Sequence, residues 1–196
     1  MKTPTKSRNL ESCMQIRRVI FVLALLPLLS FAGQSKRLPL PKELQGNTVP
    51  NFFVLAADNK GELYREDIRE AVKKTGAKRV VLSFFATWCV SCREEFAILK
   101  KNANELKKRG VLVYLINVGE NIHDYGSKAS EMASKYAGET FPCYFDPNAV
   151  LHASFGLAKR GEDLRLPLTL ILDSDLRALD ILVGKLEDDF PQVLWE

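Results

Sequence analysis

The chain has 196 residues, of which 46% are hydrophobic and 27% are charged. This length and composition fit one globular domain with a short extension, and they exclude a disordered chain. The formal net charge is +4, and much of the excess comes from the first eighteen residues, so the composition does not indicate nucleic-acid binding.

The N-terminus carries a targeting signature. Arg17 and Arg18 precede an apolar run of fourteen residues that ends at Ala32. A membrane-spanning helix needs about twenty residues, whereas the h-region of a signal peptide is shorter and is followed by small residues such as Ser30 and Ala32. We therefore predict that residues 1–32 are a signal peptide or an N-terminal membrane anchor, and that the protein is exported to the periplasm or another extracytoplasmic space.

Export places the remaining cysteines in an oxidising compartment, where disulfides persist. Three cysteines follow the signal-peptide cleavage site predicted after Ala32. They are Cys89, Cys92 and Cys143. An odd number argues against a scaffold built only of disulfides. We predict that Cys143 is a small core residue rather than a redox thiol.

The rest of the chain alternates between strand and helix patterns. Residues 33–45 are polar and contain two prolines, which predicts a linker before a domain at 46–196. The periodicity of apolar residues, with turn and helix-stop signals, then predicts the following elements: a strand at 51–57, a turn at 58–61, a helix at 65–74, a strand at 79–85, a helix at 93–109, a strand at 111–118, a helix at 128–136, a strand at 141–145, a helix at 149–155, a strand at 168–173, its hairpin partner at 178–184 and a helix at 187–195. This order predicts an α/β fold with a mixed sheet and helices on both faces.

Cys89 and Cys92 are separated by two residues, and that spacing allows three chemistries. A zinc site needs four ligands, but this pair has no second pair or paired histidines to complete it, so we predict no metal. A static disulfide over so short a loop would stabilise the fold only weakly. The third chemistry is cycling between dithiol and disulfide.

The position of the pair supports redox cycling. Cys89 falls where a buried strand ends and a helix begins, so the helix N-terminus stabilises its thiolate and lowers its pKa. The thiolate is the attacking species in thiol-disulfide exchange. We therefore predict that Cys89 attacks a substrate disulfide and that Cys92, one turn deeper, resolves the mixed disulfide.

The segment ATWCVSCREEF, residues 86–96, resembles the active site of thioredoxin-fold proteins, in particular the TlpA/ResA-like exported thiol-disulfide oxidoreductases. Further segments resemble that family in the same order, at 49–52, 116–120, 141–146 and 166–173. The resemblance covers roughly residues 46–196. It implies a thioredoxin-like mixed sheet flanked by helices, with the family's extra N-terminal strand and inserted α/β segment.

The resemblance also assigns roles around the cysteines. It implies that Pro167 is cis and faces the pair, so that the peptide at Leu166 can pair with an extended substrate. Trp88, directly before Cys89, is expected to form an apolar lid beside the sulfur or simply to pack there. Ser91 stands where the family commonly has proline, which predicts a shifted reduction potential. Leu168 replaces the family's usual threonine after the cis-proline, with Thr169 next in the chain.

Two carboxylates could act near the sulfurs. Glu95 lies three residues after Cys92, where a carboxylate can accept and return protons; the alternative is a solvated helix side chain, which we expect for Glu94. Glu120, at the end of the strand at 111–118, is a weaker candidate. Neither histidine has a spacing that indicates a site, so we predict structural or surface roles for both.

These features predict a thiol-disulfide oxidoreductase, acting as a reductant, with no cofactor besides its own cysteine pair. The resemblance implies protein disulfide or dithiol substrates, with apocytochrome c as one candidate, a membrane electron donor of the thiol-reducing type and a monomer. Two alternatives remain open. One is a thiol peroxidase of the AhpC/TSA type, which shares the fold but uses a reactive cysteine without a CxxC partner; the other is a non-catalytic binding domain.

Overall fold

A computed structural model describes residues 35–49, 52–57, 63–146, 150–159 and 162–187, together with residues 190 and 194. These residues belong to one compact unit, Gly33–Glu196. The predicted signal segment at 1–32, the turn at 58–61 and most of the helix predicted at 187–195 lie outside them. Within the described part, no helix has the length and apolar character needed to cross a membrane.

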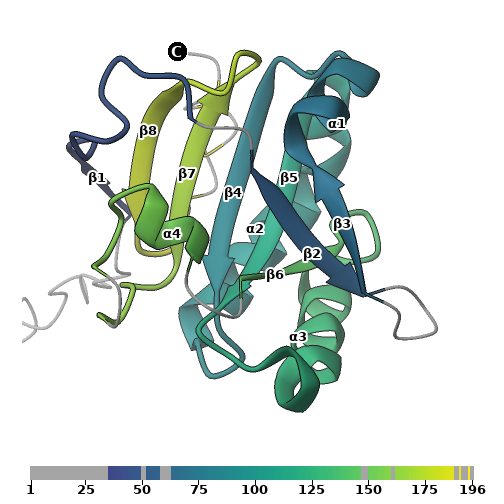
Figure 1. The fold of residues 1–196 in the computed structure, drawn as a ribbon. Coiled ribbons are helices and arrows are strands. Elements are labelled where there is room, and N and C mark those ends of the chain that lie inside the picture. The colour runs from purple at the N-terminus through teal and green to yellow at the C-terminus, as the bar shows by residue number, and fades with distance from the viewer. Residues whose placement is uncertain are drawn as a thin grey trace, which may run out of the picture. The chain divides into compact units, whose positions relative to one another are not determined.

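Eight strands of the described part form one sheet (Figure 1). They are β1 (Lys36–Leu38), β2 (Phe53–Ala57), β3 (Leu63–Asp67), β4 (Arg79–Phe85), β5 (Val111–Val118), β6 (Cys143–Asp146), β7 (Leu168–Asp173) and β8 (Ala178–Val183). Their order across the sheet is β1-β8-β7-β4-β5-β6-β2-β3. The neighbours β4, β5 and β6 are parallel and the other pairs are antiparallel. The predicted mixed sheet is therefore confirmed.

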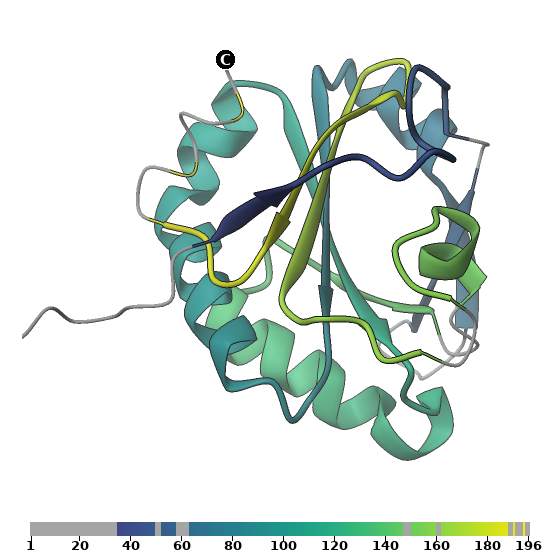
Figure 2. The same cartoon turned by 90° about the vertical axis from the view of Figure 1, so that its left-hand side faces the viewer.

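Helices cover both faces of this sheet (Figure 2). They are α1 (Ile68–Thr75), α2 (Val90–Lys108), α3 (Ile122–Ala137) and α4 (Val150–Ser154). The core residues of α2 and α3 pack in one apolar cluster, and those of α1 and α4 pack in the other. The sheet separates the two clusters, which gives three layers with β4 near the centre.

β4 is apolar except for Arg79 at its start and the buried Ser83, because both of its faces are buried. Val80, Leu82 and Phe84 face the cluster of α1 and α4, whereas Val81 and Phe85 face the cluster of α2 and α3. Successive side chains of a strand point to opposite faces, so only a strand covered on both sides shows a continuous apolar run. The interpretation of the run at 79–85 is therefore confirmed.

α2 is held to the sheet by aromatic packing. Phe96 is fully buried, and its ring meets that of Phe85 edge to face, with ring centroids 4.9 Å apart. A Phe96→Ala substitution should lower the free energy of unfolding by about 3–5 kcal/mol, because it removes buried apolar surface and leaves a cavity. Urea unfolding measures this change, with the exposed Lys107→Ala as the control, for which we expect a change below about 0.5 kcal/mol.

The segment predicted as a linker at 33–45 is partly ordered on the sheet. Lys36–Leu38 forms β1 at one edge, antiparallel to β8, and Leu44 is buried in the core. Burial of a leucine side chain stabilises the fold, so a segment that also contains polar and proline residues can still pack against the sheet. A three-residue strand is too short to show a period in the sequence.

Several element boundaries differ from the prediction because side chains cap the helices. The predicted helix at 65–74 begins only at Ile68, since Leu63–Asp67 is β3 and Asp67 accepts the backbone N–H of Glu70. Asn121 caps α3, which therefore begins six residues before the predicted start at 128. Asparagine and aspartate at these positions satisfy the first N–H groups of a helix.

Candidate active site

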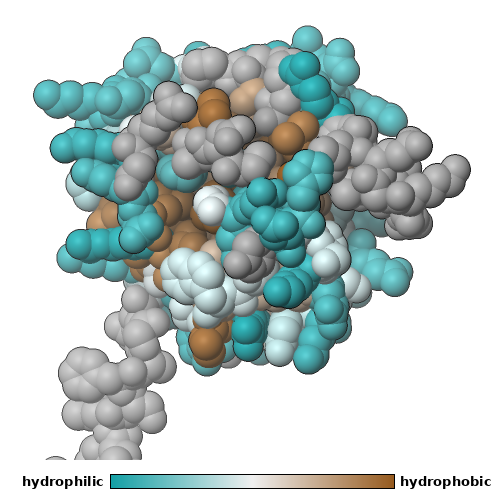
Figure 3. All heavy atoms as spheres, turned by 60° about the horizontal axis from the view of Figure 1, so that its bottom comes forward, coloured by the Kyte–Doolittle hydropathy of each residue, from teal (hydrophilic) through white to brown (hydrophobic). Residues whose placement is uncertain are grey.

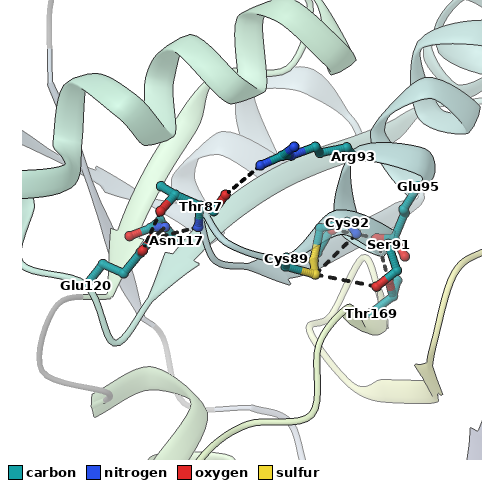
Figure 4. Close-up of a disulfide and its surroundings, with 10 residues drawn as sticks. Thr87, Cys89, Ser91, Cys92, Arg93, Glu95, Asn117, Glu120 and Thr169 are labelled. Atoms are coloured by element: carbon teal, nitrogen blue, oxygen red, sulfur yellow. Dashed lines mark hydrogen bonds between the residues drawn. A yellow bond between two sulfur atoms is a disulfide. The ribbon is translucent and has the colours of Figure 1, made fainter.

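Cys89 and Cys92 lie at the junction of β4 and α2, where the sequence predicted them. They form a disulfide, with sulfurs 2.04 Å apart (Figure 4). Cys89 is the N-cap of α2, and its Sγ accepts the backbone N–H of Cys92 at 3.2 Å. After reduction, the same N–H and the positive end of the helix dipole would stabilise a thiolate on Cys89.

The two sulfurs differ in access. Cys89 is 3% exposed and Cys92 is fully buried. The flanking residues are open to solvent, with Trp88 68% and Val90 64% exposed. Figure 3 shows the end of the domain that lies at the bottom of Figure 1, where apolar patches lie among hydrophilic side chains. Cys89 is therefore the sulfur nearer to an incoming substrate.

Ser91 brings a hydroxyl group to the pair. Its Oγ lies 3.6 Å from the Sγ of Cys89 (Figure 4). A proline at this position would have offered no polar group. The Ser91 hydroxyl can donate a hydrogen bond to a Cys89 thiolate. This bond favours the reduced, dithiol state more than an otherwise equal site with proline at this position would.

Glu95 is buried beneath the cysteine pair rather than solvated. Its side chain is fully buried, and its Oε1 accepts the hydroxyls of Ser83 at 2.6 Å and Thr169 at 3.2 Å. Its Oε2 makes no hydrogen bond of standard geometry within the described part of the chain. The structure therefore excludes the alternative of a solvated helix carboxylate, whereas Glu94 is exposed and pairs with Lys185 at 3.1 Å.

The environment of Glu95 changes its titration. Burial raises its pKa from 4.5 to about 7, against the opposing hydrogen bonds of Ser83, Thr169 and the Leu186 backbone. Burial disfavours the charged form of a carboxylic acid, because water no longer solvates the charge. A carboxyl group that titrates near neutral pH can both accept and return a proton.

The two hydroxyls that hold Glu95 were missed by the sequence analysis. Ser83 on β4 and Thr169 on β7 are directly paired across the two antiparallel strands, and both are fully buried. Each interrupts an otherwise apolar strand on the face toward α2. Buried polar groups need partners, so a hydroxyl within each apolar run was the signal that could have found them.

The turn before Cys89 is held by Glu120. Its Oε2 accepts the backbone N–H of Thr87 at 2.9 Å and the amide of Asn117 at 2.5 Å, and its Oε1 accepts the Thr87 hydroxyl at 2.6 Å. Arg93 donates to the carbonyl of Thr87 at 3.2 Å. Figure 4 shows Glu120 and Arg93 approaching Thr87 from different sides. Both residues therefore position the turn that leads to Cys89.

This arrangement predicts a measurable role for the Thr87 hydroxyl. Thr87→Val removes a donor to a carboxylate at nearly constant volume and should lower the free energy of unfolding by about 1.5–3 kcal/mol. Thr87→Ser keeps the hydroxyl and is the matched control. Equal destabilisation of both variants in urea would assign the effect to the lost methyl group and not to the hydrogen bond.

Two of the three predicted substrate-contacting residues, Trp88 and Leu166, line one cavity. The Leu166–Pro167 peptide bond is cis, as the family resemblance implied. A cavity of about 240 Å³ adjoins it, lined by Trp88, Val118, Gly119, Glu120, His152, Glu162, Asp163, Leu164 and Leu166. Trp88 and Leu166 therefore border the same space, next to the turn that carries Cys89. Pro167 is not part of this lining.

His152 and Cys143 have structural environments. His152 is buried and its Nδ1 lies 3.1 Å from Asp146 Oδ2, while Asp146 also caps α4 through the backbone N–H of Val150. Cys143 is half-buried and free, and burial raises the pKa of its thiol to about 12. A thiol with that pKa holds little thiolate at neutral pH and exchanges slowly.

A three-layer fold with a cysteine pair at the strand-to-helix junction, and with a cis-proline directly before β7, defines a thiol-disulfide oxidoreductase with a thioredoxin-like fold. A family model described as the AhpC/TSA family matches residues 45–178, and the chain belongs to that family.

Relatives and solved structures agree with that assignment. The chain is 24% identical over 147 residues to "Thiol-disulfide oxidoreductase ResA" of Bacillus subtilis, a match covering 74% of this chain and 70% of the relative. It is 31% identical over 118 residues to "Thiol:disulfide interchange protein DsbE" of Escherichia coli, covering 60% of this chain and 57% of the relative. A structure from Chlorobium tepidum described as a DsbE matches with a TM-score of 0.55 and 22% identity, over 76% of this chain and 91% of that one; it supports the fold.

Proposed function

We propose that this oxidoreductase exchanges disulfides with exported proteins and that it acts as a reductant. The position of Cys89 is the main support for this proposal. It caps α2, accepts the N–H of Cys92 and keeps a small exposed surface beside Trp88. A stabilised thiolate that keeps one edge open to solvent suits attack on a substrate disulfide.

The reaction begins with the reduced pair. The Cys89 thiolate attacks one sulfur of the substrate disulfide, a mixed disulfide forms, and the other substrate sulfur leaves as a thiolate and takes up a proton. Cys92 then loses its proton and attacks the Cys89 sulfur, which releases the second substrate thiol. Two electrons and two protons pass to the substrate, and the pair ends as the disulfide of this structure.

Glu95 would serve the second half of this reaction. Cys92 must lose a proton in a fully buried place, where no water solvates the charge. A carboxylate whose pKa lies at about 7, one turn along the same helix, suits that transfer. Glu95 would thus be the proton acceptor for Cys92, with Ser83 and Thr169 fixing its orientation.

Trp88, Leu166 and Pro167 would contact the substrate. An extended segment could lie along the peptide at Leu166, with apolar side chains against Trp88. The names of ResA and DsbE support protein thiols or disulfides as the class of substrate. Apocytochrome c is a candidate substrate, and a membrane electron donor is a candidate partner. We further propose that the protein is a monomer, that residues 1–32 direct its export, and that it uses no cofactor besides the cysteine pair.

The test compares two activities of the purified protein. We expect it to reduce insulin disulfides in the presence of dithiothreitol and to consume hydrogen peroxide no faster than the Cys89→Ser variant. Rapid peroxide consumption that depends on Cys89, with no insulin reduction, would instead assign a thiol peroxidase of the AhpC/TSA type. Activity in neither assay would leave the chain as a non-catalytic binding domain.

A further inference from the structure

A second pocket lies beside the active-site turn and shares no residue with the cavity at Leu166. It has a volume of about 310 Å³ and is lined by Thr87, Arg93, Lys128, Glu131, Met132, Lys135 and Tyr136. Three of these side chains are cationic and one is acidic. The pocket lies between the first turn of α2 and the C-terminal half of α3, and its volume is at the lower end of the range for small-molecule sites.

Arg93 is fixed in this pocket with one donor unused. Its Nη2 donates to the carbonyl of Thr87 at 3.2 Å, and its guanidinium lies 5.9 Å from the centre of the Tyr136 ring. Its Nε–H is buried and has no acceptor in the described part of the chain. Arg93 therefore keeps hydrogen-bonding capacity that the described residues do not use, on a side chain that lines the pocket.

Lys135 brings a second positive charge to the same ring. Its Nζ lies 5.2 Å from the centre of the Tyr136 ring. Neither Lys135 nor Arg93 forms an ion pair with a described residue, and Glu131, which lines the same pocket, does not lie within ion-pair distance of either. The positive charges of Arg93 and Lys135 repel each other, and an anion bound between them would offset that repulsion.

We propose that this pocket binds an oxyanion, a carboxylate or a phosphate, held by Arg93 and Lys135. The planar guanidinium matches two oxygens of either group, and hydrogen bonds between ions are stronger than those between neutral groups. Met132, which is buried, and Tyr136 form an apolar wall that limits hydration of the bound group.

The oxyanion site adjoins the redox turn without being part of it. Arg93 contacts Thr87, two residues before Cys89, so an occupant of the pocket would lie next to the surface at which a substrate or an electron donor docks. The anion could be free in solution or could be a carboxylate on such a partner. Anion binding at this site is separate from thiol exchange and is measured without redox activity.

The test follows the Arg93 Nε–H by NMR during titration of the oxidised protein with sodium phosphate, and separately with N-acetyl-glutamate amide. Sodium chloride at matched ionic strength is the blank. We expect a saturable shift of this proton, because the anion binds the guanidinium that carries it. Lys135→Gln should weaken binding about tenfold or more through the lost charge, whereas Lys107→Gln, in the last turn of α2, should bind like the wild type.

The two probes distinguish the sources of the anion. Tighter binding of phosphate supports a free anion, and tighter binding of the glutamate derivative supports a carboxylate presented by a protein partner. A shift that follows chloride as closely as either probe would overturn the proposal. So would an unchanged affinity in the Lys135→Gln variant, which alters an exposed side chain and should fold normally.

Discussion

A Cys92→Ser variant is expected to lose multiple turnover and to accumulate mixed disulfides with its substrates through Cys89. Cys89 keeps its place at the start of α2 and remains able to attack. The sulfur that would release the intermediate is gone, because Cys92 is the only cysteine bonded to it. Insulin reduction should fall by about a hundredfold or more, and mass spectrometry should find adducts on Cys89 alone.

The matched controls separate the roles of the three cysteines. Cys89→Ser should form no adducts, since Cys92 is buried, and Cys143→Ser should react like the wild type because the high pKa of Cys143 keeps it as a thiol. Adducts that persist in the Cys89→Ser variant would contradict the assignment of Cys89 as the attacking sulfur. The trapped partners would also identify the substrates.

A Glu95→Gln variant is expected to be more stable than the wild type at pH 8 and about equally stable at pH 4. Burial raises the pKa of Glu95 to about 7 from 4.5, and the unfolded chain keeps the lower value. Between these values the folded state holds one more proton, so the free energy of unfolding falls as the pH rises. The fall amounts to about 3 kcal/mol, at about 1.4 kcal/mol per pKa unit. Glutamine does not titrate, so the free energy of unfolding of the variant does not fall in this way.

Urea unfolding of the oxidised proteins from pH 4 to pH 8 measures the effect. Glu94→Gln is the control, because Glu94 is an exposed carboxylate on the same turn of α2. Its stability should follow the wild type at each pH. A Glu95→Gln curve parallel to that of the wild type would show that Glu95 has the same pKa in the folded and the unfolded chain, which would remove the basis for its role as a proton carrier.

The sequence predicted the features that depend on local pattern. The continuous apolar run of β4 indicated a strand covered on both faces, and the place of Cys89 after that strand indicated a helix N-terminus. Both follow from the period of apolar residues and from the chemistry of helix ends. The cis bond at Pro167 came from the family resemblance and not from the pattern.

The contacts between distant segments could not be predicted in this way. Ser83 and Thr169 are 86 positions apart in numbering and meet only because β4 pairs with β7 in that register. The same holds for the hydrogen bonds of Glu120 to Thr87. The burial that raises the pKa of Glu95 depends on how the layers of the fold pack together. The spacing of residues along the helix is equally compatible with a solvent-exposed Glu95.

The central claim is that Cys89 and Cys92 form a redox pair and not a structural crosslink. Equilibration of the protein with defined ratios of reduced and oxidised dithiothreitol, followed by alkylation and mass spectrometry, tests it most directly. We predict a reversible two-electron transition with a midpoint between about −120 and −270 mV, the range of exchanging pairs. A disulfide that stays oxidised below about −300 mV, as structural disulfides do, would contradict the account.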